Sequence, residues 1–328
     1  MQNDKVLNDI IFILQRLFLH MKERNKLDLL MDNKNVKLIS DYLYELYSFD
    51  FKYSMHFADI ISREIHPDSQ YSIDTELNTF INNLRKCEKL LDSEGSGFLK
   101  KNLNVEGWIL YDTVGTIRFQ ELIGVRLYIN VKTDFMEIAV KKILDMIKAG
   151  LSSTPKCTSC RNQSRPMQLL CEYCSSPLPK VYPVKFKFAN YKTIDKNKFM
   201  EALRPEKITL YIYDWKSLPQ LIANWFRPIQ GILNPQIPLF TQKLIPGIGY
   251  APNPTAEQQE RANKHTKIED IQSFGGILCN IIAKVICATS IRKGSPITEN
   301  EIPEIANLIF NTVLKENYKF EFSLGMKE

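Results

Sequence analysis

The sequence lacks three features that would each place the protein in a familiar class. No apolar run approaches the roughly 18 residues that a membrane-spanning helix needs. The first residues lead into an amphipathic pattern that Gln15 and Arg16 interrupt, unlike the apolar stretch of a signal peptide. The glycine-containing segment 246–249 lacks the lysine and hydroxyl residue of a nucleotide-binding P-loop. We therefore expect a cytoplasmic protein with no membrane span and no nucleotide cofactor.

Histidine is scarce, and the charge balance is only mildly basic. His20, His56, His66 and His265 lie at no spacing typical of a metal site or a catalytic triad, so packing or surface roles are expected. His265, near a proline-rich segment, is the one to test as an alternative general acid. The net charge of +6 is spread along the chain, which weakly favours an anionic partner and predicts no nucleic-acid binding.

Cysteine, in contrast, is present in a pattern typical of a metal site. Cys157 and Cys160 form one Cys-x-x-Cys pair, and Cys171 and Cys174 form a second after ten intervening residues. Four thiolates in two such pairs suit tetrahedral zinc and fill its coordination shell, which leaves no position for a catalytic water. We therefore predict a structural Zn²⁺ site in an insertion over residues 151–180. An iron–sulfur cluster and a redox pair are the alternatives.

Helical patterns occupy both ends of the chain, and strand patterns cluster between them. Helices are expected within 5–93 and near 134–149, 194–203, 216–227, 268–290 and 301–316. This order predicts an α+β fold with a helical N-terminal part and a central, mainly antiparallel sheet covered by helices. We expect a helical region over 1–97 and an α+β domain over 98–328, which carries the zinc insertion. Residues 228–258 hold six prolines and three glycines and are expected to be mostly loop.

Three segments alternate apolar and polar residues with period two, as a strand with one buried face does. They are residues 125–131, 184–188 and 208–213. Their polar positions are occupied by Arg126, Tyr128, Asn130, Lys185, Lys187, Thr209, Tyr211 and Tyr213. If the three strands share a sheet, one face is core and the other is a cationic, phenolic surface for an anionic substrate. Each strand taken alone fits an ordinary solvated face better, and only the coincidence of three such strands favours a functional surface.

The residue types on this polar side suit phosphate binding and proton transfer. Lys185 and Lys187 lie about 7 Å apart on one face. Each disfavours a positive charge on the other, and Arg126 on a neighbouring strand adds to this effect; a neutral lysine can act as a general base. Tyr128 and Tyr211 can donate protons or hydrogen bonds, and Arg126 and Lys185 can hold a phosphate dianion.

Several segments resemble the HopA-type effector family. They are residues 124–131, 185–190, 209–213, 238–249 and 273–275. The resemblance runs from about residue 107 to residue 290, and the zinc insertion is not part of the family pattern. Members outside pathogens act in the biosynthesis of ribosomal peptides, including class V lanthipeptides. There they resemble the phosphothreonine lyases that enteric bacteria secrete.

The resemblance implies a bacterial cytoplasmic lyase acting on a phosphorylated precursor peptide with a leader, beside a partner kinase and a cyclase. The lyase removes phosphate from phosphoserine or phosphothreonine by β-elimination and leaves dehydroalanine or dehydrobutyrine. By this resemblance Lys187 is the base, Lys185 and Arg126 bind phosphate, and Tyr211 lies beside the base. The chain departs from the lyase pattern at Tyr128, where those enzymes carry a general-acid histidine.

Two further cations and one alternative function complete the expectations. Arg204 and Lys243 are additional phosphate-binding candidates, and each would also fit an ordinary surface charge. The alternative function is a non-catalytic effector-type protein that uses the same cationic face to bind a phosphorylated ligand or host protein. The Lys-x-Lys strand with the Thr-Leu-Tyr strand after it favours the lyase, and the missing histidine favours the binding protein.

Overall fold

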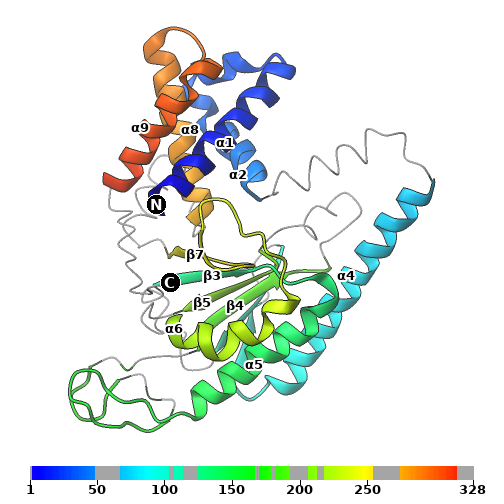
Figure 1. Cartoon of the computed structure of the whole chain (residues 1–328), viewed down its shortest axis with the longest axis vertical. Coiled ribbons are helices and arrows are strands. Elements are labelled where there is room, and N and C mark those ends of the chain that lie inside the picture. Colours follow the sequence, from blue (N-terminus) through cyan, green and yellow to red (C-terminus); the bar gives the residue numbers. More distant parts are fainter. Residues whose placement is uncertain are drawn as a thin grey trace. The chain divides into compact units, whose positions relative to one another are not determined.

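The chain folds into helices and one β-sheet, which confirms the predicted α+β class (Figure 1). The computed structural model describes residues 2–48, 67–102, 107–113, 124–166, 168, 170–176, 178, 182–192, 206–212, 218–253 and 274–315. Within these residues the helices are α1 (Gln2–Glu23), α2 (Val36–Ser48), α4 (Pro67–Glu94), α5 (Met136–Ser152), α6 (Leu218–Leu221), α8 (Phe274–Lys293) and α9 (Ile302–Lys315). The strands are β1 (Leu99–Asn102), β2 (Trp108–Thr113), β3 (Val125–Ile129), β4 (Pro183–Ala189), β5 (Ile208–Ile212), β6 (Gln242–Ile245) and β7 (Ile248–Pro252).

These elements form two compact units. In the helical unit, α1 packs against α9 and α2 packs against α8. The sheet unit holds α4, α5, α6 and nearly all of the strand residues. The grouping in space therefore brings N-terminal and C-terminal helices together. The sequence boundary expected between residues 97 and 98 stays a prediction.

An apolar stripe along α1 forms much of the core of the helical unit. Its buried members are Val6, Ile10, Ile13, Leu14, Leu17, Phe18 and Met21. This spacing places them on one face of a helix, and burying each such side chain contributes about 1.5–3 kcal/mol. The helix expected from this pattern is confirmed.

Helix α8 is apolar around most of its circumference because it lies inside the helical unit. By length and composition, Gly275–Lys293 is suited to cross a membrane, and about half of this segment is buried in the protein. The core helix of a folded bundle passes the same test, so the observation is weak evidence for a membrane span. Gly275 allows the close packing, because a Cβ there would lie 2.3 Å from the Tyr47 ring.

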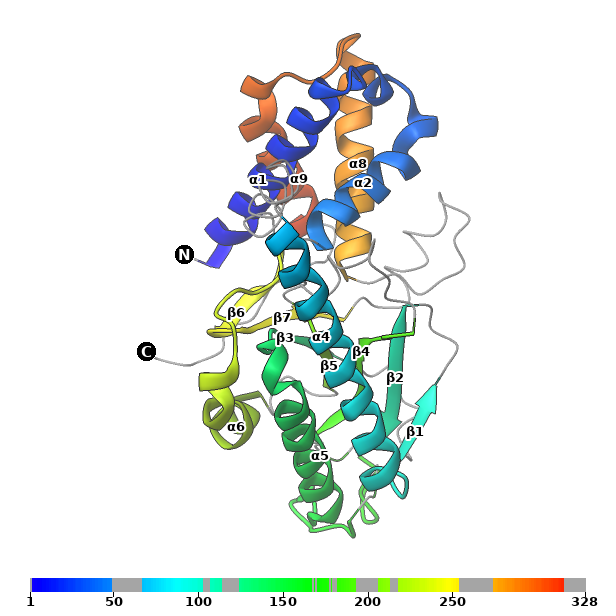
Figure 2. The ribbon, with the colours of Figure 1, turned by 90° about the vertical axis from the view of Figure 1, so that its right-hand side faces the viewer.

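The sheet has the strand order β1-β2-β4-β5-β3-β7-β6. The pairs β1–β2, β2–β4, β4–β5 and β3–β5 are antiparallel, which confirms the predicted arrangement. Helices α4 and α5 run side by side along one face of this sheet (Figure 2). On that face the Tyr111 ring stacks on Phe186 and Phe188, at centroid distances of 5.4 Å and 6.2 Å. The Tyr111 hydroxyl donates to Asp92 Oδ1 of α4 at 2.8 Å, which fixes the apolar face of the sheet toward the helices.

The expectation that residues 228–258 are mostly loop is wrong in part, because they contain β6 and β7. A two-residue turn, Pro246 and Gly247, joins these strands, and Gly247 has a φ of 83°. Proline followed by glycine is the preferred pair for a turn with positive φ at its third position, so these residues connect strands here. The helix expected near 194–203 lies outside the described residues.

Gly247 is the position in this hairpin that requires glycine. A Cβ at Gly247 would lie 2.5 Å from the Asn234 carbonyl oxygen and 2.6 Å from Leu233 Cβ. Replacing it with alanine is expected to lower the free energy of unfolding by about 2 kcal/mol, measured by urea denaturation. Gly231→Ala is the matched control, because no atom lies within 4 Å of a Cβ there, and a change below about 0.5 kcal/mol is expected. Equal stabilities of the two variants would contradict this account of the turn.

Candidate functional site

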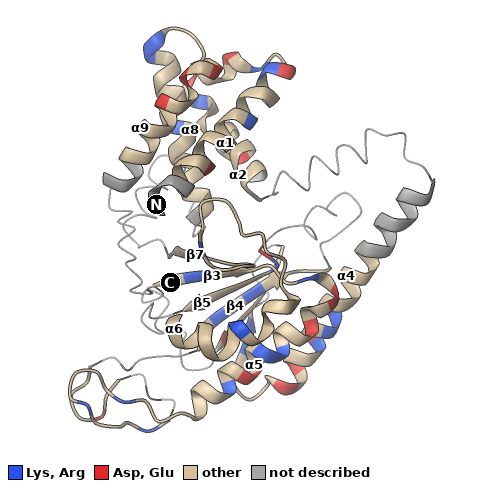
Figure 3. Ribbon diagram, viewed as in Figure 1, with Lys and Arg blue, Asp and Glu red and all other residues tan. Residues whose placement is uncertain are grey.

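Polar side chains from four neighbouring strands share one face of the sheet, opposite to the face that Tyr111 and Phe186 occupy. Directly paired residues of antiparallel strands point to the same face, and alternate residues along each strand join them. The first row, taken from β2, β4, β5 and β3, is Asp112, Lys185, Tyr211 and Arg126. The second row is Leu110, Lys187, Thr209 and Tyr128. We call these two rows, with Lys207 and Asn130 beyond them, the polar face, and blue bands on β3 and β4 in Figure 3 mark its lysine and arginine positions.

Tyr211 lies within the polar face and has three cations around it. Arg126 Cζ is 5.2 Å from the centroid of its ring, and Lys185 Nζ is 5.9 Å from the same point. Burial alone would raise the pKa of the Tyr211 phenol. The positive charges of Lys187, Arg126 and Lys185, with a hydrogen bond from Lys187, outweigh burial and lower that pKa below its ordinary value. The phenol is therefore a stronger acid than an ordinary tyrosine, although the residue is only 9% exposed.

The amine of Lys187 lies between an aromatic ring and the Tyr211 phenol. Its Nζ is 3.8 Å from the centroid of the Trp108 ring, and it also hydrogen-bonds to Tyr211. An indole face attracts a cation electrostatically, so Trp108 helps to fix where the amine lies. The residue predicted as the base is thus directed toward Tyr211 by its neighbours.

Lys185 has a counter-ion that the sequence did not reveal. Its Nζ lies 3.3 Å from Asp112 Oδ1, and the two side chains are 13% and 8% exposed. The register pairs these residues directly across β2 and β4. Asp112 therefore reduces the net positive charge of the first row, and Lys185 would meet a phosphate as one half of an ion pair.

Lys207 and its partner Asn130 were not selected as site residues from the sequence. Lys207 Nζ donates to Asn130 Oδ1 at 3.1 Å, and burial lowers the pKa of Lys207 to about 8. Lys207 precedes the alternating run that begins at Ile208, which is why the pattern did not include it. The available signal was its spacing, because Lys207, Thr209 and Tyr211 follow one another at every second position and so share a face.

The remaining predicted residues are placed as follows. Tyr128 is buried and pairs directly with Thr209, one row from Tyr211. Lys243 is exposed on the edge strand β6, and β7 lies between β6 and β3 in the sheet.

Arg204 lies outside the described residues, as do three of the four histidines. His20 packs with its ring centroid 5.5 Å from that of Tyr42, as expected for a packing role. The catalytic and phosphate-binding roles of the predicted residues stay predictions.

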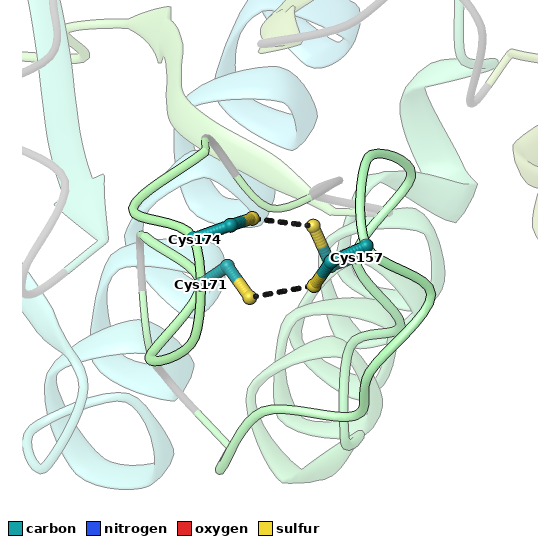
Figure 4. A group of neighbouring side chains, drawn as sticks. Cys157, Cys171 and Cys174 are labelled. Atoms are coloured by element: carbon teal, nitrogen blue, oxygen red, sulfur yellow. Dashed lines mark hydrogen bonds between the residues drawn. The ribbon is translucent and has the colours of Figure 1, made fainter.

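The four cysteines of the insertion come together as their spacing predicts. Their sulfur atoms all lie within 4.8 Å of one another, and they could bind a metal such as zinc. The two nearest pairs are Cys157 with Cys174 at 3.5 Å and Cys160 with Cys171 at 3.4 Å, and Figure 4 shows the sulfurs meeting between two loops. A zinc ion at about 2.3 Å from each sulfur would place the sulfurs roughly 3.8 Å apart.

The two Cys-x-x-Cys loops have matching backbone geometry. Arg161 N donates to Cys157 O at 3.0 Å in one loop, and Ser175 N donates to Cys171 O at 2.9 Å in the other. Both Arg161 and Ser175 have positive φ, 63° and 55°. Burial raises the pKa of Cys171, but hydrogen bonds from the backbone N–H groups of Tyr173 and its neighbour outweigh this effect, and the pKa is about 6. Such a loop favours a thiolate, the form that binds metal.

The lowered pKa of Lys207 predicts a pH dependence of stability. An unfolded lysine titrates near 10.4, so between about pH 8 and pH 10.4 the unfolded chain binds a proton that the folded chain does not. Stability is therefore expected to rise across this window, by roughly 3 kcal/mol.

The measurement is urea denaturation of wild type and Lys207→Met at a series of pH values. The variant is expected to lose this rise, whereas Lys100→Met, at an exposed lysine of β1, keeps it. Identical profiles for wild type and Lys207→Met would contradict the assigned burial of this amine.

Comparison with known proteins bears on the C-terminal part of the chain. A search of curated proteins finds no match. The sequence model of the HopA1 effector protein family matches residues 203–321, a little more than a third of the chain. This range contains β5, the β6–β7 hairpin, α8 and α9, whereas β3 and β4 precede it. The match does not test the likeness to phosphothreonine lyases. It supports a HopA-type relationship for the part of the chain that carries Lys207, Thr209 and Tyr211.

Proposed function

We propose that this protein is a lyase that removes phosphate from phosphoserine or phosphothreonine in a ribosomally made precursor peptide. The observation that carries the proposal is the position of Tyr211 among three cations on one buried sheet face. Cations can hold the dianionic phosphate, and a phenol of lowered pKa can protonate its leaving oxygen. A partner kinase supplies the phosphate, a leader on the peptide contacts the lyase, and a cyclase consumes the dehydro product.

Phosphate binding is assigned to the cations of the first row. Arg126 is only 6% exposed, and its planar guanidinium can donate two parallel hydrogen bonds to phosphate oxygens. Lys185 contributes a second donor, with Asp112 orienting its amine. Because these groups are largely removed from water, their attraction for an anion is stronger than that of surface lysines.

The elimination then requires two proton transfers, one from the α-carbon and one to the leaving oxygen. Lys187 is one of the three cations before the reaction, so it first releases its own proton to solvent. As the neutral amine it then takes the proton from the α-carbon, and the electron pair left behind forms the Cα–Cβ double bond. The Cβ–O bond breaks, and its electrons leave with the phosphate. Tyr211 donates its proton to that oxygen, so inorganic phosphate and a dehydroalanine or dehydrobutyrine residue result. Tyr128, at the position that the resemblance gives to a histidine, is the second candidate for the acid.

The second candidate function is an effector-type protein that binds a phosphorylated ligand or host protein without chemistry. The description of the matched family as an effector family favours it, as does Tyr128 in place of a histidine. Both functions use the polar face to hold a phosphate. They differ in whether the Cβ–O bond breaks.

The lyase proposal predicts a change in peptide mass. Wild type incubated with a phosphothreonine peptide is expected to produce a peptide lighter by one phosphoric acid. Lys187→Ala removes the base and is expected to lower the rate by about 100-fold or more. Lys142→Ala, at an exposed lysine of α5, is the matched control and is expected to retain the rate. Tight phosphopeptide binding by wild type without any loss of phosphoric acid would leave the binding protein as the function.

The four cysteines are assigned to a structural zinc ion, with no role in the elimination. Cys157 and Cys171 are buried against Leu178, so a bound ion would join the two loops around a small core. The insertion directly precedes β4, which carries Lys185 and Lys187. A metal that closes these loops would therefore help to hold the lysine strand in place.

Metal analysis tests this assignment. Purified wild type is expected to contain about one zinc per chain, because four thiolates complete the coordination shell. Cys171→Ser is expected to lose the metal, whereas Cys279→Ala, a buried cysteine of α8 outside the cluster, is expected to keep it. Substoichiometric zinc in wild type, or iron in its place, would reject the assignment.

A further inference from the structure

Two buried polar groups, one in β5 and one just before it, have fewer partners among the described residues than such groups normally have. Lys207, Thr209 and Tyr211 occupy every second position along the chain, so the side chains of Thr209 and Lys207 belong to the polar face. Thr209 pairs with Lys187 on one side and with Tyr128 on the other. The two groups therefore adjoin the residues to which the elimination is assigned.

The hydroxyl of Thr209 is the first of these groups. Thr209 is 1% exposed, and within the described residues its Oγ1 has no hydrogen-bond partner. The large majority of buried side-chain polar atoms in folded proteins are hydrogen-bonded, because an unpaired one loses its interaction with water without replacement. A hydroxyl in the middle of a polar face, with no acceptor among the described residues, is available to donate to a bound molecule.

The amine of Lys207 is the second. Lys207 is 6% exposed, and its Nζ donates to Asn130 Oδ1, but no carboxylate in the described part of the chain forms an ion pair with it. An ammonium has further N–H donors, which one amide oxygen cannot satisfy. A buried cation without a counter-ion is strongly destabilising unless a negative charge is brought to it.

Asn130, which accepts the hydrogen bond from the Lys207 amine, is itself held by several hydrogen bonds. Asn130 Nδ2 donates to Gln236 O at 3.2 Å, and Asn234 N donates to Asn130 O at 2.8 Å. Asn130 N donates to Gly247 O at 2.9 Å in the turn of the β6–β7 hairpin. The carboxamide that orients Lys207 is thus itself oriented by the loop and by the hairpin.

We propose that Lys207 and Thr209 together bind an oxyanion of the substrate. The hydroxyl donates one hydrogen bond, and the ammonium donates another and supplies the charge. The inference rests on the proposed function, because it makes this pair a continuation of the same substrate site. This oxyanion is one of two groups. It is either the substrate phosphate itself or a carboxylate of the same peptide, about 7 Å from the phosphorylated residue, which is two residues along an extended chain.

Binding measurements at pH 7 with three probes test the proposal by calorimetry, with Lys187→Ala present in every protein compared so that the phosphopeptides are not consumed. The probes are inorganic phosphate, a phosphothreonine peptide with glutamates two residues before and after the phosphorylated residue, and its counterpart with glutamines. Thr209→Val and Lys207→Met are each expected to weaken binding by about tenfold or more, and Thr209→Ser is expected to retain it. Weaker binding of all three probes identifies the phosphate as the oxyanion. A loss confined to the glutamate peptide identifies the carboxylate.

The melting temperature of each variant without ligand provides a second measurement. It would fall if Thr209 and Lys207 served only to stabilise the fold. Removing an unpaired hydroxyl or an uncompensated amine is expected to leave the melting temperature of each variant equal to or above that of wild type. Wild-type affinity for all three probes in Thr209→Val would overturn the proposal, even if Lys207→Met failed to fold. Absence of binding by wild type would overturn it together with the proposed function. Binding by wild type without elimination would reject the lyase, and the subsite would then be judged by the variants alone.

Discussion

The register that pairs β5 with β4 and β3 is the constraint on which the polar face depends. It brings Lys185 and Arg126 to either side of Tyr211, and a shift of one residue would turn every side chain of a strand to the opposite face. Leu210 of β5 is fully buried and pairs directly with Phe186 on the opposite face, so a shift of β5 would move a large apolar side chain out of the core. Packing on the α4 and α5 side of the sheet therefore determines which side chains lie on the other side.

The alternating pattern of single strands was enough to predict which residues of β3, β4 and β5 share a face, because the period of a strand is a local property. The cysteine spacing was equally sufficient for the four-sulfur cluster. The Asp112–Lys185 ion pair was not predictable, since it depends on which strands are neighbours and in what register. The β6–β7 hairpin was missed because proline and glycine signal a turn without showing whether strands flank it. Lys207 was missed because it lies one residue outside the run.

The polar face concentrates groups that destabilise the folded chain. Three cations surround one phenol, a buried amine has no counter-ion among the described residues, and the hydroxyl of Thr209 has no acceptor there. Each feature reduces stability on its own, and an anion would relieve all of them at once. Sites of this kind, in which local stability is lower than it could be, are typical of places where a ligand binds. The family match reaches the β5 half of this arrangement and supports its relation to HopA-type effectors.

The central claim is that the substrate phosphate binds at Tyr211, between Arg126 and the lysines of β4. A crystal structure of the Lys187→Ala variant with a phosphothreonine peptide tests it most directly, because loss of the base should trap the intact substrate. The account predicts phosphate oxygens within hydrogen-bonding distance of the Arg126 guanidinium and the Tyr211 hydroxyl, with the α-carbon facing the position of the missing amine. A phosphate bound away from the polar face would contradict it.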